Sequence, residues 1–558
     1  MRADRAARPP LGRRPKRGGL GALGVALALA VAGADCGGGP PNSGARRTAA
    51  PARVLLVGTF AGRRGGYGTI QAAVDAARPG DWVLVAPGDY HEGDDLAHPP
   101  AAGDAGAGEF GAVRITTPDI HVRGMDRASV IVDGTRPAAP GAPVAPCSAA
   151  PAAQDLGATG AGRRPEGRNG IVVDRVGGVS IENLTVCNFL SGAADAGRGV
   201  WWNGGDGGGG IGLAGYRGGY LTVTSTYAGG PTTAARDGIA ASDAAGPATW
   251  DQLYASNMGG AGLDLGACRQ RCAITIEGAW MEYDALGYSG TNAGGALVIE
   301  HSRFDENDAG VETGTRYDTD PPAPQDGDCP GTATSPVTHT RSCWVFEDND
   351  VHDNDNPDVP RAAGAAGGPT GTGLTVSGGT GDTVMDNTFE NNGAWGVLFV
   401  SEPDTGQPVA GQSCAGAGGF PLPQFGCVFD PQGDALVHNA FVHNGFFANP
   451  SDADVGQIVL QAGEPANCYA RNTLPDGSQP PLLEITQPRC AGAISSADAG
   501  GALLGQVLCD TGFGACPPGS GYPAARRVEL HTLPSLPSMP DPCAGVPPTP
   551  WCPGGRPA

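Results

Sequence analysis

The sequence contains a single lysine, Lys16, and few basic residues of any kind. Its formal charge is −22, with 57 acidic side chains against 35 lysines and arginines. Loss of residues 1–35 would remove seven basic and two acidic side chains, which would bring the charge from −22 to −27. So acidic a chain is unsuited to nucleic acid, and to binding a polyanion unaided. Without Lys16, it also has no lysine to serve as a catalytic base.

Several catalytic motifs are absent as well. The sequence has no Gly-x-Ser-x-Gly elbow, phosphate-binding loop or dinucleotide fingerprint in a supporting context. The nine histidines are scattered: His438 and His443 flank one predicted corner, and His352 lies among acids. Surface or turn positions are the simplest interpretation of these histidines. We therefore expect no organic cofactor.

A long membrane-spanning run is missing too. The apolar residues 20–32 are too few to cross a membrane as a mature helix. They follow a group of basic residues, which is typical of a signal peptide, here residues 1–35. We therefore expect an exported bacterial protein that is extracellular or held at the cell surface.

Two processing routes remain open for this signal. Ala32-Gly33-Ala34 suits signal peptidase, with cleavage before Asp35. Alternatively, Cys36 and the Gly/Pro-rich run after it resemble a lipoprotein cysteine with its tether, although Asp35 departs from the small residue expected there. Lipidation of Cys36 would leave an even 14 of the 15 cysteines. A lipid anchor is the only membrane contact that the sequence indicates.

A corner motif recurs from Tyr254 onward. An apolar residue is followed three positions later by Asn or Asp, and then by Gly and a new short strand. The instances are Tyr254/Asn257, Met281/Asp284, Phe304/Asn307, Val351/Asn354, Phe389/Asn392 and Phe441/Asn444. Without insertions the period is 23 to 27 residues, which matches one coil of a parallel β-helix. A leucine-rich repeat would need regular leucines, and a β-propeller would need about twice this period.

This period predicts stacked columns of equivalent residues. The apolar column should form the core. The Asn column should line the turns, because Asn tolerates left-handed backbone and its amide can bond the neighbouring coil. A second Asn column, at Asn349, Asn387 and Asn439, precedes the apolar residue by two positions.

Residues 68–92 read GTIQAAVDAARPGDWVLVAPGDYHE and predict how the solenoid begins. Ile70, Val74 and Ala77 recur at helical spacing over 69–78, and residues 82–86 form a short apolar strand. The stretch resembles the start of the pectin-lyase-like right-handed parallel β-helix family, in which such a helix caps the first coil. The resemblance implies an all-β fold: a single right-handed parallel β-helix with a short N-terminal capping helix.

Domain boundaries follow from these patterns. We expect a tether over 36–53, the β-helix over 54–460, and a Cys/Pro-rich extension over 461–558 without a period. The expected insertions cover residues 313–341, 357–370 and 401–431. The first and third leave the coil after the strand that follows the corner, so they should project from the same side.

In an exported protein the cysteines indicate disulfides rather than a zinc framework. Cys268 and Cys272 could form half of a zinc site, but no second close pair lies beside them. The simplest scheme joins sequence neighbours. The expected pairs are Cys147–Cys187, Cys268–Cys272, Cys329–Cys343, Cys414–Cys427, Cys468–Cys490, Cys509–Cys516 and Cys543–Cys552.

The candidate chemistry lies at acidic corners. Alignment of the Asn columns stacks Glu306 over Asp353 and Asp308 over Asp355. We expect Asp305, Asp308, Asp353 and Asp355 to bind calcium beside the 313–341 and 401–431 insertions, because calcium requires clustered carboxylate oxygens. Simple solvation of an acidic surface is the alternative.

Enzymes of the resembled family include pectate lyases, polygalacturonases and pectin methylesterases. The lyases use calcium and an Arg or Lys base, so Arg303, Asp305 and Asp353 are the catalytic candidates here. No catalytic motif of these families matches residue by residue.

Two functions follow as hypotheses. In the first, the protein binds or processes an extracellular polysaccharide, uronate-containing ones among them, in a groove beside the inserted loops. It would act as a lyase or glycoside hydrolase, and Trp395, Tyr317 and Phe425 would stack on sugars. In the second, it is a non-catalytic scaffold or adhesion protein that presents loops to a partner, such as a cell-envelope component.

Overall fold

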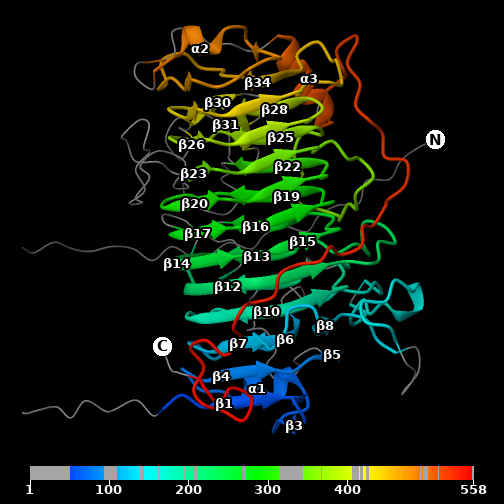
Figure 1. Cartoon of the computed structure of the whole chain (residues 1–558). Helices are drawn as coiled ribbons and strands as arrows, with labels where there is room; N and C mark the ends of the chain where they lie inside the picture. The colour runs from blue at the N-terminus through cyan, green and yellow to red at the C-terminus, as the bar shows by residue number, and fades with distance from the viewer. Residues whose placement is uncertain are drawn as a thin grey trace, which may run out of the picture. The chain divides into compact units, whose positions relative to one another are not determined.

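Each turn of the chain contributes up to three short strands, which stack on the equivalent strands of neighbouring turns in the computed structural model (Figure 1). The structure describes residues 51–93, 110–137, 144–160, 162–193, 196–205, 210–266, 268, 272–314, 344–365, 367–404, 414, 419–422, 426–489, 493, 501–512 and 514–555. Residues Ala52–Ala558 form one compact unit.

Three ladders result, and all strand pairs within them are parallel. The first ladder consists of β1 (Val54–Val57), β4 (Trp82–Val85), β7 (His121–Gly124), the first halves of β10 (Val179–Cys187) and β12 (Leu213–Thr224), β14 (Ala244–Asp251), β17 (Ile274–Glu277), β20 (Leu297–Glu300), β23 (Trp344–Glu347), β26 (Thr383–Met385), β32 (Ala435–Val437) and β35 (Cys468–Ala470). The second ladder consists of β5 (Gly88–Tyr90), β8 (Val130–Asp133), the second halves of β10 and β12, β15 (Tyr254–Ser256), β18 (Trp280–Glu282), β21 (Arg303–Asp305), β24 (Asp350–His352), β27 (Thr388–Glu390) and β33 (Ala440–Val442). The third ladder consists of β6 (Gly111–Ile115), β9 (Asn169–Asp174), β11 (Val200–Asn203), β13 (Ile239–Ser242), β16 (Ala261–Gly266), β19 (Leu286–Thr291), β22 (Ala309–Gly314), β25 (Thr372–Ser377), β28 (Trp395–Val400), β34 (Ala453–Gln457) and β36 (Ser478–Gln479).

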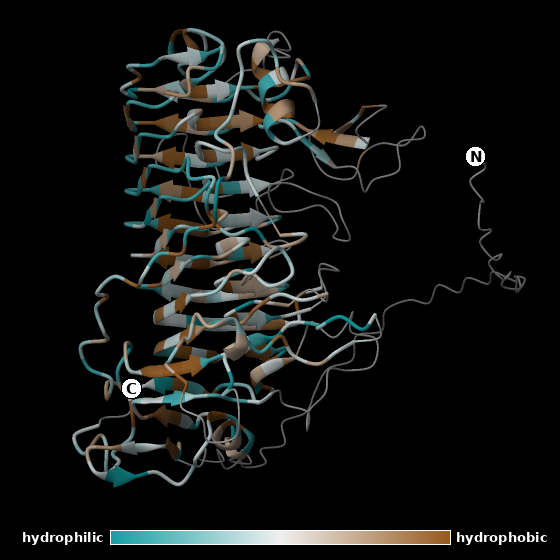
Figure 2. Ribbon diagram, turned by 90° about the vertical axis from the view of Figure 1, so that its right-hand side faces the viewer, coloured by the Kyte–Doolittle hydropathy of each residue, from teal (hydrophilic) through white to brown (hydrophobic). Residues whose placement is uncertain are grey.

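These ladders confirm the predicted right-handed parallel β-helix. The expected apolar column is the core: Phe304 pairs with Val351, which pairs with Phe389, which pairs with Phe441, and all four side chains are buried. The rings of Phe389 and Phe441 stack with centroids 5.0 Å apart. Figure 2 shows hydrophobic residues gathered in the strands, with more hydrophilic residues at the turns.

The predicted helix is α1 (Ile70–Ala76), which seals the first coils. Thr69 caps its N-terminus by accepting a hydrogen bond from Ala72 N, and Ile70, Ala73 and Val74 are buried in the core shared with β1 and β4. The helix ends before residue 78, where the prediction placed its end. Pro79 disfavours helical backbone at the preceding residue, and the chain is already extended at Ala77.

The Asn columns form hydrogen-bonded turn ladders, as expected. Asn307 Nδ2 donates to Asn354 Oδ1 over 2.9 Å, and Asn354 Nδ2 donates to Asn392 Oδ1 over 3.2 Å. The second column makes the same bonds, for example from Asn349 Nδ2 to Asn387 Oδ1 over 3.1 Å. The left-handed residue in most corners is not the Asn, however. It is the residue before it, such as Glu306 with φ of 55°, because the Asn side chain turns inward to bond.

The insertions leave the coil where the sequence predicted. Residues 357–370 lie between β24 and β25, before the third-ladder strand. Residues 401–431 follow β28 and contain a small antiparallel sheet of β29 (Glu402–Asp404), β30 (Gly419–Leu422) and β31 (Gly426–Phe429). The 313–341 insertion begins at the end of β22, and its residues from 315 lie outside the described part of the chain. Two smaller elements near the first coils are the β2 (Thr59–Phe60) and β3 (Arg63–Arg64) hairpin and a 3₁₀-helix at Pro151–Ala153.

The C-terminal extension is more ordered than the sequence suggested. Strands β35 and β36 continue the ladders past residue 460, where the recognisable repeat ends. Two helices follow, α2 (Leu483–Thr486) and α3 (Ala502–Asp510), and α3 packs Leu503 and Val507 on the outer side of β28 and β34.

Residues 514–555 then form a C-terminal strap. It runs back along the ladders from the α3 end to the β1 end of the solenoid, in orange to red in Figure 1. His531 exchanges two hydrogen bonds of 2.9 Å with the Asn257 side chain and stacks on Tyr283 with ring centroids 3.3 Å apart. At the far end, Trp551 is buried against Phe60 and Trp82. The C-terminal strap has no sequence repeat, yet it contacts coils that lie far apart in the sequence.

Five disulfides in the structure are among the expected pairs: Cys147–Cys187, Cys268–Cys272, Cys414–Cys427, Cys509–Cys516 and Cys543–Cys552. Cys268–Cys272 is thus a disulfide rather than half of a zinc site. Cys468 is also disulfide-bonded. Cys36, Cys329, Cys343 and Cys490 lie outside the described residues.

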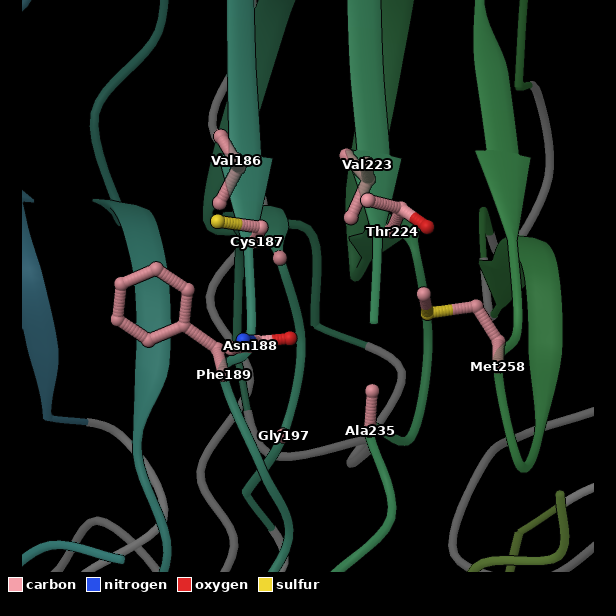
Figure 3. A pocket seen from close by; sticks show the side chains of 10 residues that line it. Val186, Cys187, Asn188, Phe189, Gly197, Val223, Thr224, Ala235 and Met258 are labelled. Atoms are coloured by element: carbon pink, nitrogen blue, oxygen red, sulfur yellow. The ribbon is translucent and has the colours of Figure 1, made fainter. Parts of the chain in front are cut away.

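One gap lies within the core between β10 and β12 (Figure 3). Val186, Phe189, Val223 and Met258 line it, and it has no space for a water molecule. It is a packing gap and cannot hold a ligand.

No helix in the described ranges combines the length and the apolar character needed to cross a membrane.

Candidate functional site on the second ladder

The outer face of the second ladder carries two adjacent rows of side chains, which we call the aromatic row and the carboxylate row. In-register pairing of parallel strands stacks equivalent positions about 4.8 Å apart. The aromatic row is Tyr254, Trp280, Arg303 and Asp350. The carboxylate row is Ser256, Glu282, Asp305, His352 and Glu390.

Asp305 lies at the centre of these rows. Its Oδ1 accepts a hydrogen bond of 2.7 Å from Trp280 Nε1, and its Oδ2 pairs with Arg303 Nη2 at 2.6 Å. The side chain is buried. Burial raises the pKa of Asp305 although Arg303 acts in the opposite direction. Both oxygens are therefore engaged, and Asp305 fixes the indole and the guanidinium in place.

Arg303 also contacts the aromatic row. Its guanidinium carbon lies 4.8 Å from the centroid of the Trp280 ring, while the side chain is 45 % exposed. Burial lowers the pKa of Arg303, but Asp305, Asp350 and Glu282 together outweigh it, and the net direction is upward. Such a guanidinium is a poor base, which argues against the predicted role of Arg303 as proton acceptor. It is suited instead to binding a carboxylate.

Glu282 is the proton-donating candidate in the carboxylate row. Its Oε1 accepts a hydrogen bond of 2.6 Å from the Tyr254 hydroxyl, and the Tyr254 ring meets Trp280 edge-on with centroids 5.4 Å apart. Burial raises the pKa of Glu282, and the neighbouring Asp305 raises it further. A carboxyl group with a raised pKa can stay protonated closer to neutral pH and act as a general acid.

His352 supplies an imidazole on the next coil. Its Nδ1 lies 2.7 Å from Asp353 Oδ2, and its side chain is 17 % exposed. When Nδ1 donates its proton to Asp353, Nε2 keeps a free lone pair and can accept a proton. Asp353, a catalytic candidate from the sequence, thus orients His352.

The corner acids occupy neighbouring coils, as the alignment predicted, since β21 pairs with β24. Their environments differ, however. Asp308 is buried and pairs with Arg361 Nη2 at 2.6 Å, and Thr370 also donates to it. Burial, Asp353 and Asp308 together raise the pKa of Asp355 to about 6. Among the described residues, Asp305, Asp308, Asp353 and Asp355 do not include three whose oxygens all lie within 4.8 Å of one another.

Sequence reasoning missed a further carboxylate at this corner. Asp510, at the end of α3, has its pKa raised to about 8 by burial and by Asp308. Asp308 Oδ1 and Asp510 Oδ2 are both buried without a hydrogen-bond partner. No local pattern could place Asp510 there, because the two aspartates are brought together by the docking of α3.

The two large insertions leave the coil at the opposite edge of the third ladder from these acids, and their placement beside the acids stays a prediction. The acidic corner precedes β22, whereas the 313–341 and 401–431 insertions follow third-ladder strands. Six extended residues, roughly 20 Å of chain, separate the two edges. The insertion beside the corner is 357–370, which contributes Arg361 and Thr370.

Of the predicted stacking platforms, the structure describes Trp395, which does not lie on this face. Trp395 is fully buried beneath α3 and donates from Nε1 to Ser451 O over 2.8 Å, so it offers no ring to a ligand. Tyr317 and Phe425 lie outside the described residues. On this face Trp280 is half-buried, so part of its ring is accessible. The position of Trp280 in this row could have been predicted from the sequence. Trp280, Arg303 and Asp350 each lie four positions before a corner Asp or Asn.

Comparison with solved structures finds proteins of the same architecture at low similarity. A mannuronan C-5 epimerase A-module (AlgE6) from Azotobacter vinelandii is 14% identical, with 72% of this chain and 88% of that chain covered and a TM-score of 0.38. An alginate lyase from Paenibacillus sp. is 12% identical, with 73% and 98% covered and a TM-score of 0.34. The pectate lyase Pel9A is 10% identical, with 77% and 78% covered and a TM-score of 0.33.

No protein-family model matches the sequence, and no curated protein sequence matches it.

Proposed function

We propose that the second-ladder face binds an acidic extracellular polysaccharide and cleaves it by proton transfer. The observation that supports this most directly is the carboxylate row Glu282–Asp305–His352 beside Trp280 and Arg303. A sugar ring can stack on the half-buried indole, and the exposed guanidinium can bind a uronate carboxylate. A local cationic group of this kind is what so acidic a chain needs to hold a uronate.

The proposed reaction is an elimination. Glu282 and His352 lie on either side of Asp305, two coil spacings or roughly 10 Å apart at the backbone, so one sugar ring that lies over Asp305 can reach both side chains. His352 Nε2 takes the proton from the ring carbon beside the carboxylate, whose charge Arg303 neutralises. The bond from the adjacent carbon to the glycosidic oxygen breaks, a carbon–carbon double bond forms, and Glu282 donates a proton to the departing oxygen.

The disulfides fit the expected location of such a protein. Disulfides form and persist outside the cytoplasm, in the compartments through which exported proteins pass. Extracellular or cell-surface placement is therefore part of the proposal, as is the polysaccharide partner.

The test is a panel of uronate polysaccharides incubated with the full chain. Ultraviolet absorbance detects the unsaturated product of elimination, and reducing ends count every cleavage. Absorbance together with reducing ends supports the proposed reaction. Reducing ends without absorbance would replace elimination by hydrolysis. Binding without cleavage would favour the scaffold hypothesis, and neither binding nor cleavage across the panel would overturn the proposal.

A further inference from the structure

Three metal-ligating side chains meet at the N-terminal end of the second ladder, apart from the candidate site. Asp89 lies in β5, His91 follows that strand, and Asp133 ends β8, with which β5 pairs. The carboxylate oxygens and the imidazole nitrogen of these residues all lie within 4.8 Å of one another. Parallel pairing of β5 and β8 produces this proximity, because His91 and Asp133 follow the paired residues Tyr90 and Val132.

The imidazole of His91 is oriented for coordination. Its Nδ1 lies 2.6 Å from Thr135 O, and since a carbonyl only accepts, Nδ1 must carry the proton. Nε2 then has a free lone pair and lies 3.1 Å from Asp89 Oδ2. Two ligands of a tetrahedral ion, each roughly 2.0–2.1 Å from it, would lie roughly 3.3 Å apart. A backbone carbonyl that fixes the second ring nitrogen is a frequent partner of metal-bound histidine.

The carboxyl groups of Asp89 and Asp133 lie close enough to interact. Asp133 is fully buried, and its oxygens accept hydrogen bonds from Thr135 N at 2.8 Å and Cys147 N at 2.6 Å. Asp89 Oδ1 is buried without a hydrogen-bond partner. Within the described residues, neither carboxylate forms an ion pair with an arginine. Burial raises the pKa of Asp89, and the proximity of Asp133 raises it further.

A simple ion pair between His91 and Asp89 is the plainest alternative. It would account for the contact between Nε2 and Asp89 Oδ2. It would leave Asp89 Oδ1 without a partner and the Asp133 carboxylate close to a second negative charge. A bound cation accounts for all three features.

We infer that Asp89, His91 and Asp133 bind a divalent transition-metal ion, with Zn²⁺ the best match. One imidazole nitrogen and two carboxylate oxygens suit zinc, whereas calcium prefers oxygen ligands alone. The side chains of His91 and Asp89 are 25 % and 23 % exposed, so an ion can enter and keep water in its remaining position. The ion ties β5 to β8, and through the Asp133 bond to Cys147 it also braces the Cys147–Cys187 disulfide.

The test uses the full chain after removal of metal by a chelator. Calorimetric titration with Zn²⁺, together with metal counting after dialysis, should show one bound equivalent and a higher melting temperature. Asp89→Asn and His91→Gln should each lower the affinity by at least about tenfold, because second-shell changes alone cost that much. His438→Gln is the matched control: His438 faces one carboxylate, Asp386 at 3.7 Å, and should leave Zn²⁺ binding unchanged.

Three results would overturn the inference. The first is an absence of Zn²⁺ binding by the folded wild type, with folding checked by circular dichroism. The second is binding that survives both Asp89→Asn and His91→Gln. The third is Ca²⁺ binding of equal strength that does not depend on His91, which would exclude the imidazole as a ligand. None of these depends on polysaccharide cleavage.

Discussion

The backbone N–H of Asp382 donates a hydrogen bond of 2.8 Å to Oδ1 of Asp434 on the next coil. On the coil after that, Asn467 occupies the same position and accepts from Asp434 N over 3.0 Å. The two aspartates thus stand in an asparagine-type turn ladder inside the solenoid. Asp434 Oδ2 has no hydrogen-bond partner, whereas Asn467 Nδ2 donates to Pro431 O over 3.1 Å.

Asp434→Asn should therefore stabilise the protein at neutral pH. Burial, together with Asp382, raises the pKa of Asp434 well above its ordinary value. The favourable protonated form is fully present below the unfolded pKa of about 3.8, and its contribution is lost as pH rises through the folded pKa. The Asn variant should gain roughly 1–3 kcal/mol at pH 7 and lose this pH dependence. Denaturant unfolding across pH checks it.

Asp386→Asn is the control for this ladder variant. Asp386 is a corner acid whose side chain is 42 % exposed, so its replacement should change stability by less than about 0.5 kcal/mol. A destabilised Asp434→Asn protein at pH 7 would show that the buried carboxyl group has a partner that the ladder geometry does not supply.

Phe389→Ala tests the core column. Phe389 is fully buried between Val351 and Phe441, and truncation should cost roughly 3–5 kcal/mol of unfolding free energy. Val442→Ala, at a position 43 % exposed, provides the comparison and should have little effect. Equal unfolding curves for Phe389→Ala and the wild type would contradict the column assignment.

Trp551→Ala tests the C-terminal strap. Trp551 packs against Phe60 and donates from Nε1 to Arg63 O over 3.1 Å, which anchors the end of the strap. Loss of this anchor should open the strap locally and speed its proteolytic cleavage several-fold, because local opening requires less free energy than global unfolding. Leu533→Ala, at a position 41 % exposed, should leave the cleavage rate unchanged. An unaltered rate for Trp551→Ala would show that other contacts hold the strap.

Glu282→Gln tests the proposed acid. If the elimination occurs on the second ladder, the change should lower kcat by roughly 10²–10⁴-fold and alter polysaccharide affinity by only a few-fold. The raised pKa of Glu282 also predicts that wild-type activity falls as pH rises through it. Glu300→Gln, on the first ladder, is the matched control. Activity that persists in Glu282→Gln would remove Glu282 from the mechanism.

Calcium binding at the corner stays a prediction. Asp355 and Asp353 repel each other across the corner, and a divalent ion would relieve this repulsion and engage the unpartnered Asp308 Oδ1. Added Ca²⁺ should raise the melting temperature, and the double variant Asp353→Asn, Asp355→Asn should abolish that shift. Asp348→Asn, at another corner, should preserve it. If calcium does not change melting, the acids are a solvated surface.

The sequence by itself determined the coil, its corners and its core. A turn that recurs in every coil needs the same local residues each time, so the Phe389 column and the Asn307 ladder are visible as a repeat. The α1 cap is visible as a single local pattern of helical spacing. The pairing of Asp305 with His352 also follows from alignment of the corners, since parallel strands stack in register.

The tertiary structure decided which side chains are exposed and which distant segments touch, because neither property follows from the repeat period. Whether an outward side chain is exposed depends on what docks over it, and α3 buries Trp395 while leaving Trp280 accessible. The placement of Asp510 near Asp308 and the anchoring of Trp551 on Phe60 join parts of the chain that share no repeat. The cost of closing such long loops rises only slowly with length, so distant segments can pack together without leaving any local signal in the sequence.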